Sequence, residues 1–431
     1  MSGESAGASG RVGQPARAGE DSAWTPRRVL LLTPRWARDG GVGAHVVASA
    51  TALAQRGVEV LVLVAKIDSA ERVAGVEVCA WPGMLDRDTP ARARLEPALA
   101  WGADLAHLHQ VDDPELVQAL GHAAPVLISA HGYTACTSGV HYFRPGHECA
   151  RAHGPGCVPH LVSCAHVRNP KPLPRRYRQA GRGRRALRDA HLAISYSSAV
   201  DRHLAANGVD HRAVVPYFPT IPAVAQADPP EDVNRVVFAG RVIAAKGVGV
   251  LVRAAAGIAA QVVVCGDGHG LEQSRRLARR LGVSERVRFT GWLSPQQLGA
   301  ELSAASVVVL PSVWPEPFGI VGIEAHAAGK PVVASATGGV GDWLEHDVSG
   351  LMVSPGDSVA LAGALQALLA DPQRRAAMGA AGKRSVAARF SERRHVQALM
   401  ESYRAARERR EALAPLDAEQ PPAALAGAGA G

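Results

Sequence analysis

Two glutamates in one stretch, LPSVWPEPFGIVGIEAHAAG (310–329), are the residues best suited to chemistry in this 431-residue chain. Glu316 lies in a proline-rich turn after a β-branched run that is typical of a buried parallel strand. Glu324 lies inside an otherwise apolar helix that we expect to begin near Phe318 and end at Gly329. An ionised carboxylate there is costly unless hydrogen-bond donors satisfy it. Sugar or ribose hydroxyls could do so, and a structural ion pair is the alternative.

The start of the same helix predicts an anion site. The first N–H groups of a helix have no partner within it, and its dipole is positive at that end. The N–H groups of Gly319, Ile320 and Val321 would therefore face whatever lies above the sheet. A phosphate group fits such a site.

Two basic residues follow another predicted strand, in the segment FAGRVIAAKG. Arg241 and Lys246 would lie beside the helix start, where a guanidinium and an ammonium could clamp a diphosphate. Read without that helix, the two residues are ordinary surface charges.

Glycine-rich turns and one histidine complete the candidate site. GGVG (40–43) and GDGHG (266–270) follow predicted strands, and Gly41, Gly43, Gly266 and Gly268 would let the backbone approach a nucleotide closely. A plain tight turn would have the same composition. His131 directly follows the strand VLISA, so its side chain would project into the same cleft, where it either makes a polar contact to a substrate or has a structural role.

The elements that position these residues alternate between strand and helix, which predicts an α/β fold with two Rossmann-like, doubly wound domains. Ligands in such sheets lie outside the carboxyl ends of the strands, so the two domains would face a shared cleft. The predicted order is a disordered tail (1–25), a first domain (26–216) with an insertion (136–188), a linker (217–232), a second domain (233–390), a C-terminal helix (391–411) and a disordered tail (412–431).

The insertion carries cysteines and histidines without a CxxC pair: Cys136, Cys149, Cys157 and Cys164 among His141, His147, His153 and His160. A metal site, reduced structural thiols and a disulfide all stay open. A basic run follows at 168–188, which is either a solvated face or a surface for an anionic membrane or a phosphate-bearing lipid acceptor.

Composition narrows the partners and the compartment. The formal net charge of +8 favours anionic partners, although nothing indicates a nucleic acid. No apolar run is long enough to span a bilayer, and the N-terminus lacks the apolar core of a signal peptide. We expect a cytoplasmic protein, with peripheral contact at the inner face of the membrane as one interpretation of the basic run.

Taken together, these motifs resemble the retaining GT-B glycosyltransferases of family 4. Glu316 and Glu324 match that family's E-x7-E signature, FAGRVIAAKG its basic diphosphate clamp, and GGVG and HGY its glycine loop and histidine. The resemblance implies transfer of a sugar from a nucleoside diphosphate sugar to a polysaccharide, glycolipid or small-molecule acceptor in cell-envelope or glycoconjugate biosynthesis, with no metal or other cofactor required.

The resemblance also implies individual roles. Arg241 and Lys246 would neutralise the leaving diphosphate, Glu316 would contact the transferred sugar, and His131 would hydrogen-bond that sugar. Glu324 would bind the ribose, and Phe318, Gly319 and Ile320 would belong to the nucleotide site together with the glycines. A nucleotide-sugar epimerase of the same fold, and a non-catalytic protein that binds nucleotides or anionic lipids, are the alternatives.

Overall fold

The computed structural model describes residues 24–38, 40–68, 72–137, 139, 142–144, 147–149, 151–161, 173–222 and 234–413. The tails expected at 1–25 and 412–431 lie outside these residues, except for the short pieces that begin at Trp24 and end at Leu413. The expected linker is described only as far as Pro222.

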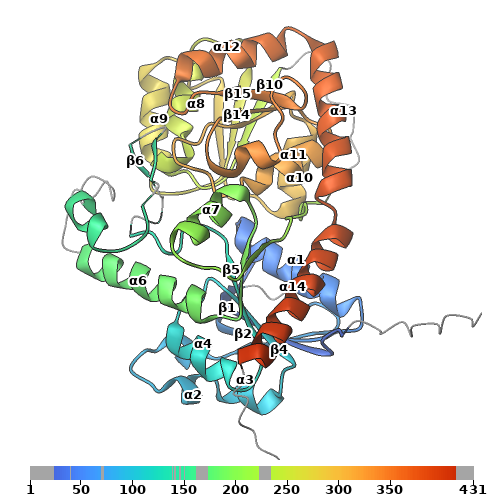
Figure 1. Ribbon diagram of the computed structural model, residues 1–431. Helices are drawn as coiled ribbons and strands as arrows, with labels where there is room; N and C mark the ends of the chain where they lie inside the picture. The colour runs from blue at the N-terminus through green and yellow to red at the C-terminus, as the bar shows by residue number, and fades with distance from the viewer. Residues whose placement is uncertain are drawn as a thin grey trace, which may run out of the picture.

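The first half of the chain builds a seven-stranded parallel sheet in the order β3-β2-β1-β4-β5-β8-β9. Its labelled strands β1, β2, β4 and β5 lie in the lower half of the view in Figure 1. The strands are β1 (Arg28–Trp36), β2 (Glu59–Ile67), β3 (Val76–Ala80), β4 (Leu105–His109), β5 (Val126–Ala130), β8 (Leu192–Ser195) and β9 (Arg212–Val214). The helices are α1 (Gly41–Ala54), α2 (Ala91–Arg94), α3 (Glu96–Trp101), α4 (Pro114–Gly121), α6 (Leu173–Asp189) and α7 (Ser198–Ala206).

The second half builds a six-stranded parallel sheet in the order β12-β11-β10-β13-β14-β15. Its strands are β10 (Arg235–Ala239), β11 (Gln261–Cys265), β12 (Val287–Gly291), β13 (Val307–Leu310), β14 (Val332–Ser335) and β15 (Gly350–Val353). Its helices are α8 (Val248–Ala255), α9 (Leu271–Arg280), α10 (Pro295–Ser303), α11 (Ile320–Ala327), α12 (Ser358–Leu369) and α13 (Pro372–Arg389).

Short elements complete the fold: the antiparallel pair β6 (Tyr142–Arg144) and β7 (His147–Glu148), and the 3-10 helices η1 (Pro82–Leu85), η2 (Pro155–His160), η3 (Ala244–Lys246) and η4 (Gly338–Asp342). The last helix, α14 (Glu392–Leu413), leaves the second domain and packs along the first (Figure 1). There the Arg410 guanidinium donates to the carbonyls of Gly121 and His122.

Both sheets change winding direction beside a central strand. From β10 the chain runs outward to β11 and β12 and then returns to β13 on the other side of β10. The loops that follow β10 and β13 therefore diverge over neighbouring strand ends and leave a crevice between them. Arg241 and Lys246 follow β10, and Glu316 follows β13, so the topology places all three residues beyond the carboxyl ends of two neighbouring strands.

Three expected boundaries are corrected. The first helix begins at Gly41 instead of Ala44, which makes most of the glycine loop helical. The helix expected at 91–101 is interrupted at Leu95, because Pro97 cannot continue a helix through the preceding turn. The helix expected near Phe318 begins at Ile320, with Gly319 as its left-handed cap.

The two domains also touch directly. The carboxylate of Asp342, in η4, accepts hydrogen bonds from the backbone N–H and the hydroxyl of Ser198, at 2.8 and 2.6 Å. Ser198 is the first residue of α7, so the negative charge meets the positive end of a helix from the opposite domain. This contact helps to hold the two domains against each other beside the cleft.

Candidate active site

Glu316 is the centre of a buried polar cluster. Glu316 is only 4% exposed, and both of its carboxylate oxygens accept hydrogen bonds from Lys246 Nζ, at 2.6 and 2.8 Å. Ser312 Oγ and Trp314 Nε1 donate to Oε2, at 2.7 and 3.2 Å. Burial raises the pKa of Glu316, but the Lys246 ammonium and these donors outweigh that effect and hold the pKa below its usual value. The carboxylate is therefore ionised and paired.

Glycines make this pairing possible. Gly247, in the left-handed region at φ 70°, ends η3, and a Cβ on it would collide with the carbonyl of Pro311. The segment after β10 can thus lie directly on the end of β13, which delivers Lys246 to Glu316. From the other side, the backbone N–H of Gly339 donates to the carbonyl of Glu316 at 2.7 Å.

Glu324 faces a different space. It lines a cavity of about 720 Å³ between the domains, bounded by Gly41 of the first domain and by Ile320 and Val321 of α11. Thr220, from the segment that connects the domains, donates to Glu324 Oε1 at 3.1 Å. Burial raises the pKa of Glu324 to about 7, with the Thr220 hydrogen bonds opposing the shift.

A second cleft, of about 1300 Å³, lies on the other side of the α11 start. His131, Arg241 and Pro317 line it, and so does Val42, the residue that follows Gly41. A Cβ added to Gly41 would lie 2.9 Å from Ile320 Cγ2, so the ends of α1 and α11 approach closely between the two cavities. A ligand could extend from the Glu324 cavity past the free N–H groups of α11 into the cleft beside His131.

The structure fills in the surroundings of His131. Its Nδ1 lies 2.7 Å from the Tyr217 hydroxyl, and its Nε2 lies 3.0 Å from His109 Nδ1. Burial, with a contribution from His395, lowers the pKa of His131 to about 3, so the ring is neutral. Both ring nitrogens already have protein partners. A hydrogen bond from the ring to a sugar would replace one of them, and that role stays a prediction.

A buried network of histidines and tyrosines supports His131, and sequence reasoning missed it. It joins His45, His107, His109 and His395 to Tyr196, Tyr217 and Tyr403 through ring contacts and short hydrogen bonds. Alternate residues of a strand share one face, so the sequence HLH (107–109) signals that two histidines lie together. The partners on α14 had no local signal.

Several predicted nucleotide-binding residues have packing roles. A Cβ on Gly43 would collide with the carbonyl of Ala37, and one on Gly266 with the carbonyl of Gly240. A Cβ on Gly268 would lie 2.5 Å from the carbonyl oxygen of Val242. Their lack of a side chain lets backbone approach backbone, although Gly266 also lines the Glu324 cavity. Phe318 is buried against Tyr217 and Phe390, so its side chain belongs to the core.

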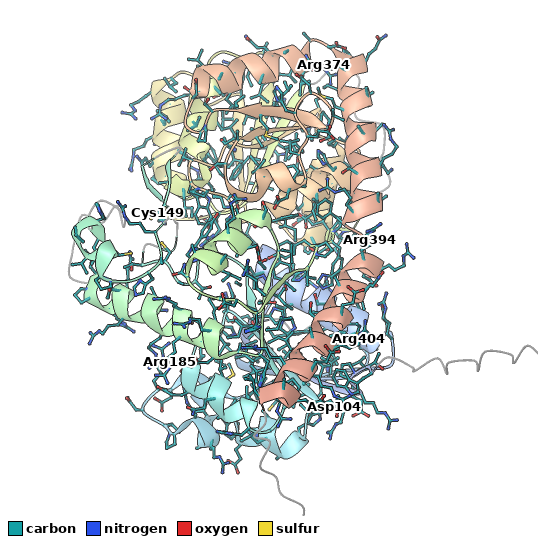
Figure 2. The ribbon with its side chains drawn as sticks, in the orientation of Figure 1. Asp104, Cys149, Arg185, Arg374, Arg394 and Arg404 are labelled. Atoms are coloured by element: carbon teal, nitrogen blue, oxygen red, sulfur yellow. The ribbon has the colours of Figure 1, made fainter. Side chains whose placement is uncertain are left out.

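The cysteine and histidine insertion shows no metal centre in its described part. Cys136, Cys149 and Cys157 are free thiols, which excludes a disulfide among these three. With His153 and His160 they line a cavity of about 440 Å³, but no three His, Cys, Asp or Glu side chains among the described residues are arranged to hold a metal ion. Cys164, His141 and the side chain of His147 lie outside the description. Figure 2 shows Cys149 in an arm at the side of the molecule, away from α14.

The basic run is less free than its composition indicates. Its described part, 173–188, lies in α6, where Arg182 pairs with Asp113 and Glu115 at 3.0 and 3.1 Å. Arg184 donates to the carbonyls of Asn207 and His153. No helix of the described part of the chain is long and apolar enough to cross a membrane. Membrane contact through this run stays a prediction.

Comparisons with known proteins place the chain in a family. The model for glycosyl transferases group 1 matches residues 223–385, which contain both glutamates and the basic pair. A D-inositol 3-phosphate glycosyltransferase of Rhodococcus jostii is 32% identical and matches over 88% of this chain and 90% of its own length. The chain belongs to the group 1 glycosyltransferases.

Other matches are more local or concern the fold. A D-inositol 3-phosphate glycosyltransferase of Salinispora tropica is 41% identical, but over only 41% of this chain and 39% of its own length. Anabaena HepE, solved in complex with UDP and glucose, has a TM-score of 0.67 at 21% identity and covers 87% of this chain and 99% of its own. At that identity the likeness shows the fold, which is the GT-B arrangement of two Rossmann-like domains.

Proposed function

We propose that this protein transfers a sugar from a nucleoside diphosphate sugar to an acceptor hydroxyl, with retention at the anomeric carbon. The observation that carries the proposal is the placement of Glu324 and the start of α11 in one interdomain cavity, beside a second cleft that Arg241 lines. A buried carboxylate suits ribose hydroxyls, and a helix start suits phosphate. The UDP bound by HepE, which shares the fold, supports a uridine nucleotide as the first choice.

In this arrangement the nucleoside lies in the Glu324 cavity and the diphosphate lies at the N–H groups of Gly319 and Ile320. The transferred sugar then enters the second cleft, beside His131 and Arg241. Negative charge grows on the diphosphate as the sugar leaves, and Arg241 together with the α11 dipole stabilises that charge. The sugar gains oxocarbenium character as the bond to the diphosphate breaks.

Lys246 has a double task in this proposal. Its ammonium is shared with Glu316, which lies next to Pro317 at the boundary of the second cleft. In the proposal Lys246 acts on the departing diphosphate and Glu316 on the sugar, although neither residue is among those that line the two cavities. No metal is needed to balance the leaving group in this scheme.

A binding experiment tests the nucleotide part. The thermal midpoint of the full protein is measured with UDP, GDP, ADP, UDP-glucose and the bare sugar, because a ligand that binds only the native state raises it. We expect one nucleoside diphosphate to stabilise the wild type and to stabilise Glu324→Gln less. If no nucleotide shifts the midpoint, the proposal fails.

A turnover experiment tests the reaction class. With the stabilising nucleotide sugar, a transferase needs an acceptor and gives a product whose anomeric configuration is read from the NMR coupling constant. Retention supports the proposal. Release of nucleotide and free sugar at full rate without an acceptor would indicate the epimerase-type reaction instead.

A further inference from the structure

Two arginines line the second cleft and have no partner among the described residues. Arg241 follows β10 in the second domain, and Arg176 lies in the first turn of α6 in the first domain. Within the part of the chain that the structure describes, neither guanidinium has an ion pair or a hydrogen bond, and both residues are exposed. The proposed function uses Arg241 for the diphosphate of the sugar donor. It leaves Arg176 without a role.

The neighbours of Arg176 on the same helix behave differently. Arg182 pairs with Asp113 at 3.0 Å, and Arg185 pairs with Asp189 at 3.2 Å; neither arginine lines the cleft. Arg175 and Arg178 are exposed but do not line the cleft. Arg176 is therefore the arginine of the described helix α6 that lines the cleft, and Arg175 is a matched control on the same helix.

The walls around Arg176 offer further hydrogen-bond donors. Gln179, one turn along α6, lines the cleft together with Thr134 and Thr137, which follow β5. Asp112 is the single carboxylate among the described lining residues. The positive charges of Arg87 and Arg182 are close enough to interact electrostatically with it. Its Oδ2 faces Gly183, where a Cβ would lie 2.9 Å from it, and burial raises its pKa. The α6 end of the cleft thus combines a fixed positive charge with amide and hydroxyl groups.

We propose that Arg176, assisted by Gln179 and Thr134, binds a phosphate group of the acceptor, so that the acceptor is a phosphate ester of a sugar or polyol. The inference rests on the proposed function, which puts the reacting carbon at the His131 and Arg241 end of the same cleft. A planar guanidinium fork matches two phosphate oxygens at once. Its position in the first turn of α6 adds the positive helix dipole. A neutral glycan would leave this charge unused.

Inorganic phosphate is the probe for this site. The full protein is first saturated with UDP, which occupies the phosphate subsite of the sugar donor, and phosphate binding is then measured by isothermal titration. We expect binding of one phosphate per chain in the wild type and in Arg175→Gln. In Arg176→Gln the affinity should fall by about tenfold or more, because the charge-assisted hydrogen bonds are lost. Circular dichroism confirms that both variants fold.

Two results would overturn the proposal: no phosphate binding to the UDP-loaded wild type, or equal binding to Arg176→Gln. Because UDP binding is measured beforehand, failure of the phosphate step alone leaves the sugar-donor proposal intact. Failure of UDP to bind counts against the uridine nucleotide chosen in the proposed function instead, and phosphate titration without UDP still compares Arg176→Gln with the control.

Two further arms distinguish the source of the phosphate. Displacement of bound phosphate by glucose 6-phosphate, but not by phosphatidic acid vesicles, indicates a soluble acceptor. Vesicle binding that Arg176→Gln abolishes and Arg175→Gln preserves indicates a lipid-linked acceptor. If both variants weaken vesicle binding equally, the vesicles bind the basic surface and not the cleft. If, in addition, displacement by glucose 6-phosphate does not depend on Arg176, the proposed cleft site is overturned.

Discussion

Replacing Lys246 by alanine should destabilise the protein as well as slow it. Lys246 donates to both carboxylate oxygens of Glu316, and Glu316 is only 4% exposed. After the substitution the Ser312 and Trp314 donors still reach Oε2, but Oε1 loses the single donor it has among the described residues. Leaving a buried carboxylate without its counter-ion costs about 3–5 kcal/mol. The free energy of unfolding should fall by that order.

Adding Glu316→Gln to Lys246→Ala tests whether the loss of stability comes from the unpaired negative charge of Glu316. In Lys246→Ala/Glu316→Gln the buried negative charge is gone, and we expect the double variant to be more stable than Lys246→Ala by about 2 kcal/mol. Its turnover should stay as low as that of either single variant, because the reaction needs both charges. The two effects, on folding and on rate, should therefore separate.

Urea denaturation followed by circular dichroism measures the stabilities, and initial rates with the identified sugar donor measure turnover. Arg241→Ala is the matched control. Arg241 is exposed and unpaired in the described part of the chain, so its loss should change stability by less than about 0.5 kcal/mol while lowering turnover by one or more powers of ten. A Lys246→Ala variant as stable as the wild type, with no recovery in the double variant, would refute this reasoning.

Three other predictions concern the remaining site residues. Glu324→Gln should mainly raise the KM for the sugar donor, whereas Glu316→Gln should mainly lower kcat; the reverse pattern in steady-state kinetics would invert the two roles. Because burial raises the pKa of Glu324 to about 7 and hydroxyls donate best to the ionised form, nucleotide affinity should weaken as pH falls through 7. Titration at several pH values should show this slope, and Glu324→Gln should abolish it. His131→Ala should keep nucleotide affinity in equilibrium binding while lowering turnover, since His131 belongs to the opposite domain.

One more prediction concerns acid stability. Burial lowers the pKa of His107 and His131 to about 3 and that of His395 to about 4, below the 6.5 of an unfolded chain. The unfolded state therefore binds more protons below pH 6.5, and stability that is complete above pH 7 is lost as the pH falls. At pH 5 each of these histidines costs about 2 kcal/mol. Thermal midpoints measured from pH 8 to 5 should fall steeply, and a flat profile would contradict the neutral network.

Local patterns in the sequence were sufficient for the parallel strands, because buried β-branched runs such as SVVVLPS have few other stable arrangements. They also placed Arg241, Lys246 and Glu316 in the loops after two parallel strands, whose carboxyl ends lie at one edge of a sheet. Helix starts were less predictable. Gly41 could begin a helix or end a loop. In the structure it begins α1, at a point where a Cβ would lie 2.9 Å from Ile320 Cγ2 of the other domain.

Only the tertiary structure decided which charges are paired. Lys246 and Glu316 are seventy residues apart, and their pairing depends on Gly247 lying against Pro311, a contact that no local pattern encodes. The same holds for Thr220 on Glu324, and for the partners of His131, which come from β4 and from the segment between the domains. A short-range sequence pattern predicts which helices and strands form and which residues follow them. Hydrogen-bond partners depend on distances between elements, and these are set when the domains and α14 pack together.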